Sequence, residues 1–150
     1  MLPSKLFAWL ALAFSICAGI AKLFLPSAMD IGLRGQYFSF GPMLVPLFCA
    51  VTSANFAVLY YAAARIFQAR WNRPLSNLHF SLSVCFGVSG SLSYLMSTRA
   101  GNHPSGETAL LWMFALLLLG ILSFVASYVI FGINLILVSA QIVRARFATR

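Results

Sequence analysis

Long apolar stretches alternate with short charged segments along the whole chain. The apolar stretches run from Leu6 to about Leu25, within Gly35–Ala64, within Pro74–Thr98 and over Thr108–Val143. A membrane-spanning helix needs about 20 mainly apolar residues, so each of the first three stretches suits one span. The last stretch is longer than one span needs but too short for two spans and a turn. We therefore predict four transmembrane spans, of which the fourth tilts or projects beyond the membrane.

These spans are predicted to be helices, because any open structure in hydrocarbon leaves backbone polar groups without partners. Pro42 and Pro46 lie early in the second span and Pro74 opens the third. A proline costs little there, since the first N–H groups of a helix lack intrahelical partners anyway. Residues 101–106 are typical of a turn between the third and fourth spans. The pattern predicts an all-α membrane protein, with residues 1–150 forming a single four-transmembrane-helix bundle.

The composition agrees with a membrane location. Hydrophobic residues make up 61% of the 150 residues and charged residues 8%, against about 25% charged residues in soluble domains. A cleaved signal peptide is an alternative for the first stretch, because Lys5 precedes its apolar core. A lipoprotein site at Cys17 is disfavoured, since the preceding Phe14-Ser15-Ile16 lacks the usual small residue.

The basic residues predict how the spans are oriented. Seven of them fall at the two termini and in the middle loop: Lys5, Arg65, Arg70, Arg73, Arg144, Arg146 and Arg150. Three lie in or beside the other two loops, together with both acids: Lys22, Arg34, Arg99, Asp30 and Glu107. Because basic residues favour the cytoplasmic side, both ends are predicted to lie inside (N-in/C-in). The net charge of +8 is then explained by topology and anionic headgroups, and its scattered distribution argues against nucleic-acid binding.

Several uncharged polar residues lie within the spans. Asn55 is mid-span in the second and Asn134 is in the inner half of the fourth, while the third carries serines and glycines: Ser81, Ser83, Ser89, Ser91, Ser93, Gly87 and Gly90. The favoured interpretation is helix packing, in which small residues permit close approach and amides bond across helices. The alternative is a small transporter or lipid-handling protein with both asparagines as polar contacts. The predicted spans hold no carboxylate that would carry a coupled proton.

His79 is the candidate cofactor-binding residue. It lies about one turn inside the third span, and a lone histidine there is more often a hydrogen-bonded structural residue than a ligand. The alternative is an axial haem ligand, paired with Met43, Met96 or a residue of a partner, or a contact to a quinone. The spans contain no second histidine for bis-histidine ligation, so no resident cofactor is predicted.

Catalytic and metal sites are not predicted. Cys17, Cys49 and Cys85 fall in separate spans without metal-ligand spacing, and we interpret them as buried free thiols. No hydrolase, kinase or dinucleotide motif is present. The sequence therefore gives no reason to expect an enzyme.

The segment Met29–Phe38 resembles the start of a late helix in subunit I of the haem-copper oxidases. The family pattern is roughly Asp-Ile-x-Leu-His-Asp-Thr-Tyr-Phe, and five residues match it: Asp30, Ile31, Leu33, Tyr37 and Phe38. Tyr60-Tyr61 is similar to the aromatic exit of that helix, and Leu78-His79-Phe80-Ser81-Leu82 resembles the opening of the next. The resemblance covers nearly the whole chain and corresponds to the last four helices of the twelve-helix subunit. Those four helices also start and finish in the cytoplasm.

The resemblance implies the fold without the family's activity. Pro42 and Leu44 stand where the family has two haem-ligating histidines, and Arg34-Gly35-Gln36 replaces its His-Asp-Thr. His79 matches a family position that is not a haem ligand, and oxygen reduction needs a redox metal centre. We therefore expect a non-catalytic membrane subunit of the bacterial cytoplasmic (inner) membrane. Its expected partners are a larger respiratory or photosynthetic complex, with lipids or pigments.

Overall fold

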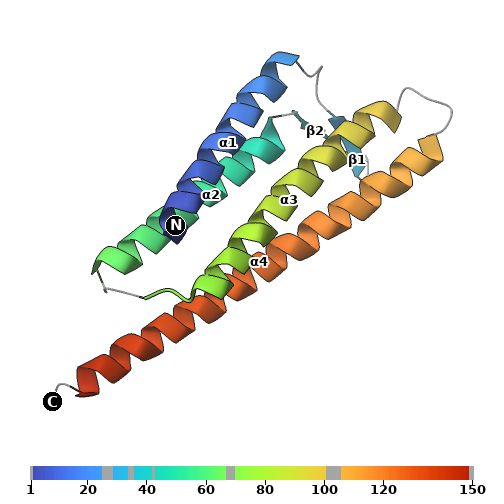
Figure 1. Cartoon of the computed structure of the whole chain (residues 1–150). Helices are drawn as coiled ribbons and strands as arrows, with labels where there is room; N and C mark the ends of the chain where they lie inside the picture. The colour runs from blue at the N-terminus through green and yellow to red at the C-terminus, as the bar shows by residue number, and fades with distance from the viewer. Residues whose placement is uncertain are drawn as a thin grey trace.

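Four long helices form the whole bundle. The computed structural model describes residues 2–24, 29–33, 36–41, 43–66, 70–100 and 106–148. The helices are α1 (Pro3–Phe24), α2 (Leu44–Ile66), α3 (Arg73–Ala100) and α4 (Gly106–Ala148). They run alternately up and down, so both termini lie towards the same end (Figure 1).

Each of the four helices is long and apolar enough to cross a membrane. The predicted all-α four-span bundle is thereby confirmed, while the side of the membrane that holds the termini stays a prediction. The predicted turn at 101–105 lies outside the described residues, as do Arg34, Gly35, Pro42 and Arg150.

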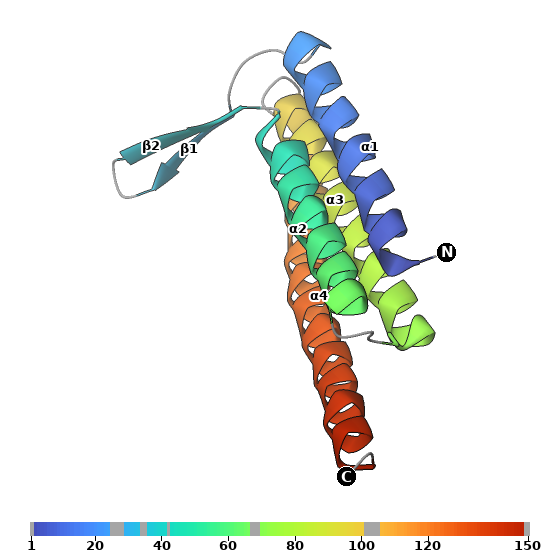
Figure 2. The ribbon, with the colours of Figure 1, turned by 90° about the vertical axis from the view of Figure 1, so that its left-hand side faces the viewer.

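A short β-hairpin, which the sequence pattern did not predict, lies between α1 and α2. Strands β1 (Met29–Leu33) and β2 (Gln36–Phe40) pair antiparallel, with Met29 opposite Phe40 and Leu33 opposite Gln36. The hairpin projects sideways from the end of the bundle opposite the termini (Figure 2). Antiparallel pairing satisfies these backbone groups without a helix, and aromatic residues favour such strands. The second span therefore begins only at Leu44, whose N–H donates to the Gly41 carbonyl at 3.0 Å.

The start of α3 is capped by a side chain from the preceding loop. The Asn72 side-chain oxygen accepts a hydrogen bond from the Leu75 N–H at 3.2 Å, as expected of an N-cap residue. Pro74 is the second residue of the helix, where its missing N–H removes no intrahelical bond. The prediction that Pro74 opens the third span is confirmed.

Small residues bring α3 and α4 into close contact. A Cβ atom added at Gly120 of α4 would lie 2.9 Å from the Ser89 hydroxyl and 3.8 Å from the Gly90 backbone nitrogen. Nearby, the Ser93 hydroxyl donates to the Met113 carbonyl at 3.1 Å, and the Ser123 hydroxyl donates to Cys85 Sγ at 3.3 Å. Close approach of this kind is how helices associate in a membrane, where lipid weakens the hydrophobic drive.

Two glycines of α3 also allow side chains of α1 and α2 to pack closely against α3. A methyl group at Gly87 would overlap the Phe14 ring of α1, and one at Gly90 would lie 3.0 Å from a methyl carbon of Val45 of α2. Ser81, by contrast, is exposed, and the Ser91 hydroxyl bonds the Gly87 carbonyl of its own helix. The helix-packing interpretation therefore holds for Gly87, Gly90, Ser89 and Ser93 but not for Ser81 or Ser91.

Replacing Gly120 with valine is expected to lower the free energy of unfolding by about 1–3 kcal/mol, because α3 and α4 are forced apart. The matched control is Gly132→Val on the same helix, where an added Cβ meets no atom within 4 Å. Denaturant unfolding in detergent micelles measures both variants. Equal losses in the two variants would show that the close approach at Gly120 is not stabilising.

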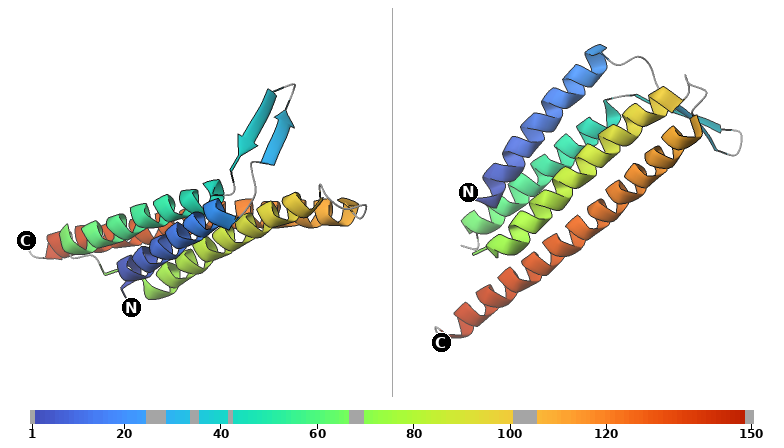
Figure 3. Two further views of the ribbon diagram at one scale, coloured as in Figure 1. Left: turned by 90° about the horizontal axis from the view of Figure 1, so that it is seen from above. Right: turned by 45° about the vertical axis from the view of Figure 1, so that its right-hand side comes forward.

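Helix α4 is much longer than a bilayer requires. Its 43 residues span about 65 Å, roughly twice the hydrocarbon thickness. It runs past the other three helices at the end of the bundle that holds the termini (Figures 1 and 3). The prediction of one long fourth helix that projects beyond the membrane is consistent with this arrangement.

Candidate functional site

His79 lies where all four helices meet. Its side chain is fully buried. Its imidazole packs against Phe7 of α1 at 4.7 Å, Phe56 of α2 at 4.4 Å and Phe131 of α4 at 5.4 Å, measured between ring centroids. The Phe56 ring stands at 88° to the imidazole, the edge-to-face arrangement that aromatic pairs favour. His79 thus packs against each of the other three helices.

One nitrogen of His79 has a hydrogen-bond partner, and the other has none in the part of the chain that the structure describes. The Tyr60 hydroxyl lies 3.0 Å from Nδ1, whereas the buried Nε2 has no hydrogen-bond partner among the described residues. We assign the proton to Nε2, because an N–H facing aromatic rings keeps a weak interaction and a bare lone pair there has none. In this tautomer the Tyr60 hydroxyl donates to Nδ1.

Asn134 connects α4 to the beginning of α3. Its amide donates to the Ser76 hydroxyl at 3.0 Å, and its oxygen accepts from the Asn72 N–H at 3.2 Å. The Ser76 hydroxyl in turn donates to the Asn72 carbonyl at 2.9 Å. The His79–Asn134 cluster, meaning His79, Tyr60, Ser76, Asn134 and the Asn72 backbone, therefore bonds across α2, α3 and α4.

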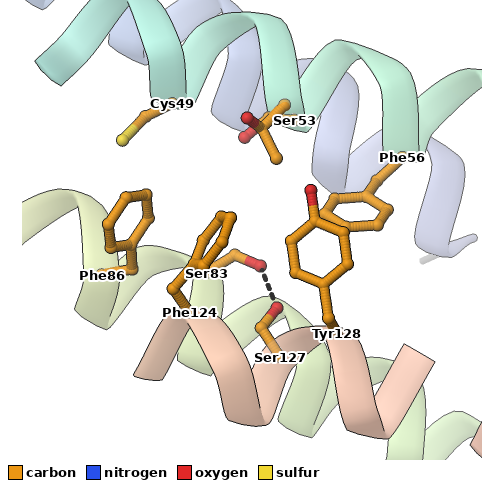
Figure 4. Close-up of a pocket in the computed structure, with 9 residues that line it drawn as sticks. Cys49, Ser53, Phe56, Ser83, Phe86, Phe124, Ser127 and Tyr128 are labelled. Atoms are coloured by element: carbon orange, nitrogen blue, oxygen red, sulfur yellow. Dashed lines mark hydrogen bonds between the residues drawn. The ribbon is translucent and has the colours of Figure 1, made fainter. Parts of the chain in front are cut away.

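A small cavity lies beside this cluster, between α2, α3 and α4 (Figure 4). Its volume is about 10 Å³, room for about one water molecule. The Ser83 and Ser127 hydroxyls bond to each other at 2.9 Å across its floor, and the Tyr128 hydroxyl points towards α2. Ser127 also lies 3.5 Å from the His79 carbonyl. The cavity is far too small for an organic cofactor.

The described residues do not fit a haem at His79. Met96 lies 17 residues further along α3, which places it about 25 Å away. Met43 precedes α2 by one residue and is equally far along that helix from Tyr60, which contacts His79. Two axial ligands must lie on opposite sides of one iron atom, so neither methionine serves. The aromatic rings around His79 also occupy the space that a macrocycle needs.

Larger hollows lie on the outside of the bundle and do not include His79. One of about 290 Å³ lies between α1, α2 and α3 and is lined by Ile20, Pro46 and Leu95 among others. Another of about 320 Å³ lies between α1 and α2 and is lined by Lys5, Ala8 and Tyr61 among others. Their mainly apolar walls suit lipid chains.

The two mid-span asparagines occupy different environments. Asn134 is fully buried and bonded, which confirms the helix-packing interpretation for this residue. Asn55 is exposed on the outside of α2 and makes no hydrogen bond with any residue that the structure describes. For Asn55 the expected bond within the bundle is therefore absent from the described part of the chain. The two side chains cannot line one transport path, because one faces inward and the other outward.

The cysteines provide no metal centre in the described part of the chain. Cys17 is exposed, Cys49 is buried and Cys85 is half-buried, and all three are free. The prediction of a buried thiol is thus right for Cys49 and wrong for Cys17, which faces outward from α1. No group of three or more metal-ligating side chains occurs among the described residues.

Comparisons of the chain with family models, with curated proteins and with solved structures find no match. The resemblance to subunit I of the haem-copper oxidases therefore rests on the sequence pattern. The described residues of its first motif lie in strands β1 and β2 of this structure.

Proposed function

We propose that the chain is a non-catalytic integral membrane subunit that packs against a larger respiratory or photosynthetic complex. One observation carries this proposal: the polar side chains inside the bundle bond to one another or to backbone groups of the bundle, beside a cavity of only about 10 Å³. Small-molecule sites usually need several hundred Å³ with convergent polar groups, and the two outer hollows of about that size have mainly apolar walls. In this chain the buried polar side chains bond one helix to another instead.

The outer surface of the bundle supports a role in packing. Only 17% of the most apolar part of α4 is buried inside the bundle, against 33% for α2. Large side chains such as Trp112 and Phe114 are more than half exposed on α4. Lipids or the helices of a partner would cover this surface, because it is too apolar to face water.

We place the chain in the bacterial cytoplasmic membrane with both termini inside. The described basic residues support this orientation, because five of them lie at the end of the bundle that holds the termini: Lys5, Arg65, Arg70, Arg73 and Arg144. Lys22 lies near the opposite end. This asymmetry follows the positive-inside rule.

Affinity purification from the native membrane tests the proposal. The chain carries a tag at its natural expression level, a mild detergent solubilises the membrane, and mass spectrometry quantifies the recovered proteins. A larger multi-span complex is expected in stoichiometric amounts, and an unrelated four-span protein with the same tag serves as the control. Recovery of the chain alone, or only with copies of itself, would refute the proposal.

Electron transfer through a haem is the second candidate function, and one observation favours it: Nε2 of His79 has no hydrogen-bond partner among the described residues. Because the packing around His79 leaves no space for a macrocycle, the purified protein is expected to show no Soret band. An absorption spectrum of the purified chain measures this directly. A Soret band that disappears in a His79→Ala variant would show that His79 is a haem ligand and not only a packing residue.

A further inference from the structure

Asn55 is the polar side chain whose position the bundle itself does not explain. It lies midway along α2, between Leu44 and Ile66, and therefore near the centre of the span. Its side chain is exposed and has no hydrogen-bond partner among the described residues. An amide in hydrocarbon is costly unless it bonds to another group, and lipid tails offer none.

The residues around Asn55 form a continuous seam along the outside of α2. They follow one another at alternating spacings of four and three: Leu44, Phe48, Val51, Asn55, Val58 and Ala62. Positions at this spacing share one face of a helix, as in the seam of a coiled coil. The four large apolar members, Leu44, Phe48, Val51 and Val58, are 45%, 49%, 55% and 64% exposed. We call these six residues the Asn55 seam.

No described helix covers the Asn55 seam. In Figure 2, α2 lies on the near side of the bundle with no other helix in front of it. Phe48, at one edge of the seam, contacts Phe86 of α3 and Phe124 of α4. This edge of the seam therefore packs against the interior of the bundle. A single asparagine within an otherwise apolar seam is the arrangement that fixes the register of two packed helices.

We propose that the Asn55 seam is the docking surface for α2 of a second copy of this chain. Two copies in one membrane share the same orientation, so their α2 helices run parallel about a two-fold axis along the membrane normal. Each Asn55 then meets the other at the same depth. An amide carries both a donor and an acceptor, so the two side chains bond reciprocally. An identical helix thus matches the seam in direction, depth and chemistry.

This dimer does not depend on the larger complex, so it can be tested on the purified chain. A photo-cross-linking amino acid is placed at position 51 or 58 of the seam, and the protein is reconstituted into liposomes at low protein-to-lipid ratio. We expect both positions to give a product of twice the chain's mass. Position 122, where Leu122 is 59% exposed on α4, is the matched control and should give little product.

The Asn55→Leu variant isolates the contribution of the amide. It is expected to keep its helical content, because the side chain makes no described bond within the bundle, and to lose the cross-linked product by about tenfold. Asn55→Gln retains an amide and should retain much of the product. Three results would overturn the inference: no cross-link from the seam, an equal yield from position 122, or a full yield in Asn55→Leu. A seam cross-linked to a different protein in native membranes, with no dimer in liposomes, would also overturn it.

Discussion

Replacing Phe56 with alanine is expected to lower the free energy of unfolding by about 2–3 kcal/mol. The Phe56 ring contacts Phe7 of α1, His79 of α3, and Tyr128 and Phe131 of α4. Removing a buried ring costs about 3–5 kcal/mol in soluble proteins. The expected loss of stability is smaller here because the separated helices stay in an apolar lipid or detergent environment. The Phe56 side chain is then not transferred to water on unfolding, so its removal costs less transfer free energy.

Phe114→Ala is the matched control for Phe56→Ala. Its ring is 60% exposed on the outside of α4, so its removal should change stability by about 0.5 kcal/mol or less. Unfolding of both variants by denaturant in detergent micelles, followed by circular dichroism, gives the two values. Similar losses for the two phenylalanines would show that the aromatic cluster around His79 is not the stabilising core.

Replacing Asn134 with leucine is expected to destabilise the bundle by about 1–2 kcal/mol, because buried polar groups lose their partner. The Asn72 N–H and the Ser76 hydroxyl both bond Asn134. Leucine has the same branching and the same number of side-chain heavy atoms as asparagine and is larger in volume, so the loss does not come from a cavity. The same unfolding measurement applies.

A double-mutant cycle with Ser76→Ala identifies the bond itself. If the two residues act together, the double variant loses less stability than the sum of the single variants. Ser139→Ala is the control, because within the described part of the chain its exposed hydroxyl bonds only the Leu135 carbonyl of its own helix. Strict additivity between Asn134 and Ser76 would contradict the bond.

The helices of the bundle could be predicted because a membrane span is recognised from the length and average hydropathy of a segment. Length and apolarity decide whether a segment crosses a membrane, and the stretches starting at Leu6, Pro74 and Thr108 are each long enough and contain no acidic residue. The hairpin was missed because Tyr37, Phe38 and Phe40 count as apolar in either a strand or a span. Pairing between two strands is a contact between residues, which hydropathy does not record.

The environments of the polar residues were only partly predictable for a related reason. Asn55 and Asn134 look alike in the sequence, yet one faces outward and the other is fully buried. A helix that is apolar on all sides gives no sign of which face points inward. The four-three spacing around Asn55 was present in the sequence, but only the exposure of its members shows that it lies on the outside.

Native gel electrophoresis of gently solubilised membranes tests the central claim most directly. The membranes come from cells that make the tagged chain at its natural level, and the gel is probed for the tag. The proposed role predicts that most of the chain migrates in one band of a complex several times its own mass of 16.4 kDa, with other membrane proteins in that band. Migration as a monomer or a dimer alone would contradict the role as a subunit of a larger complex.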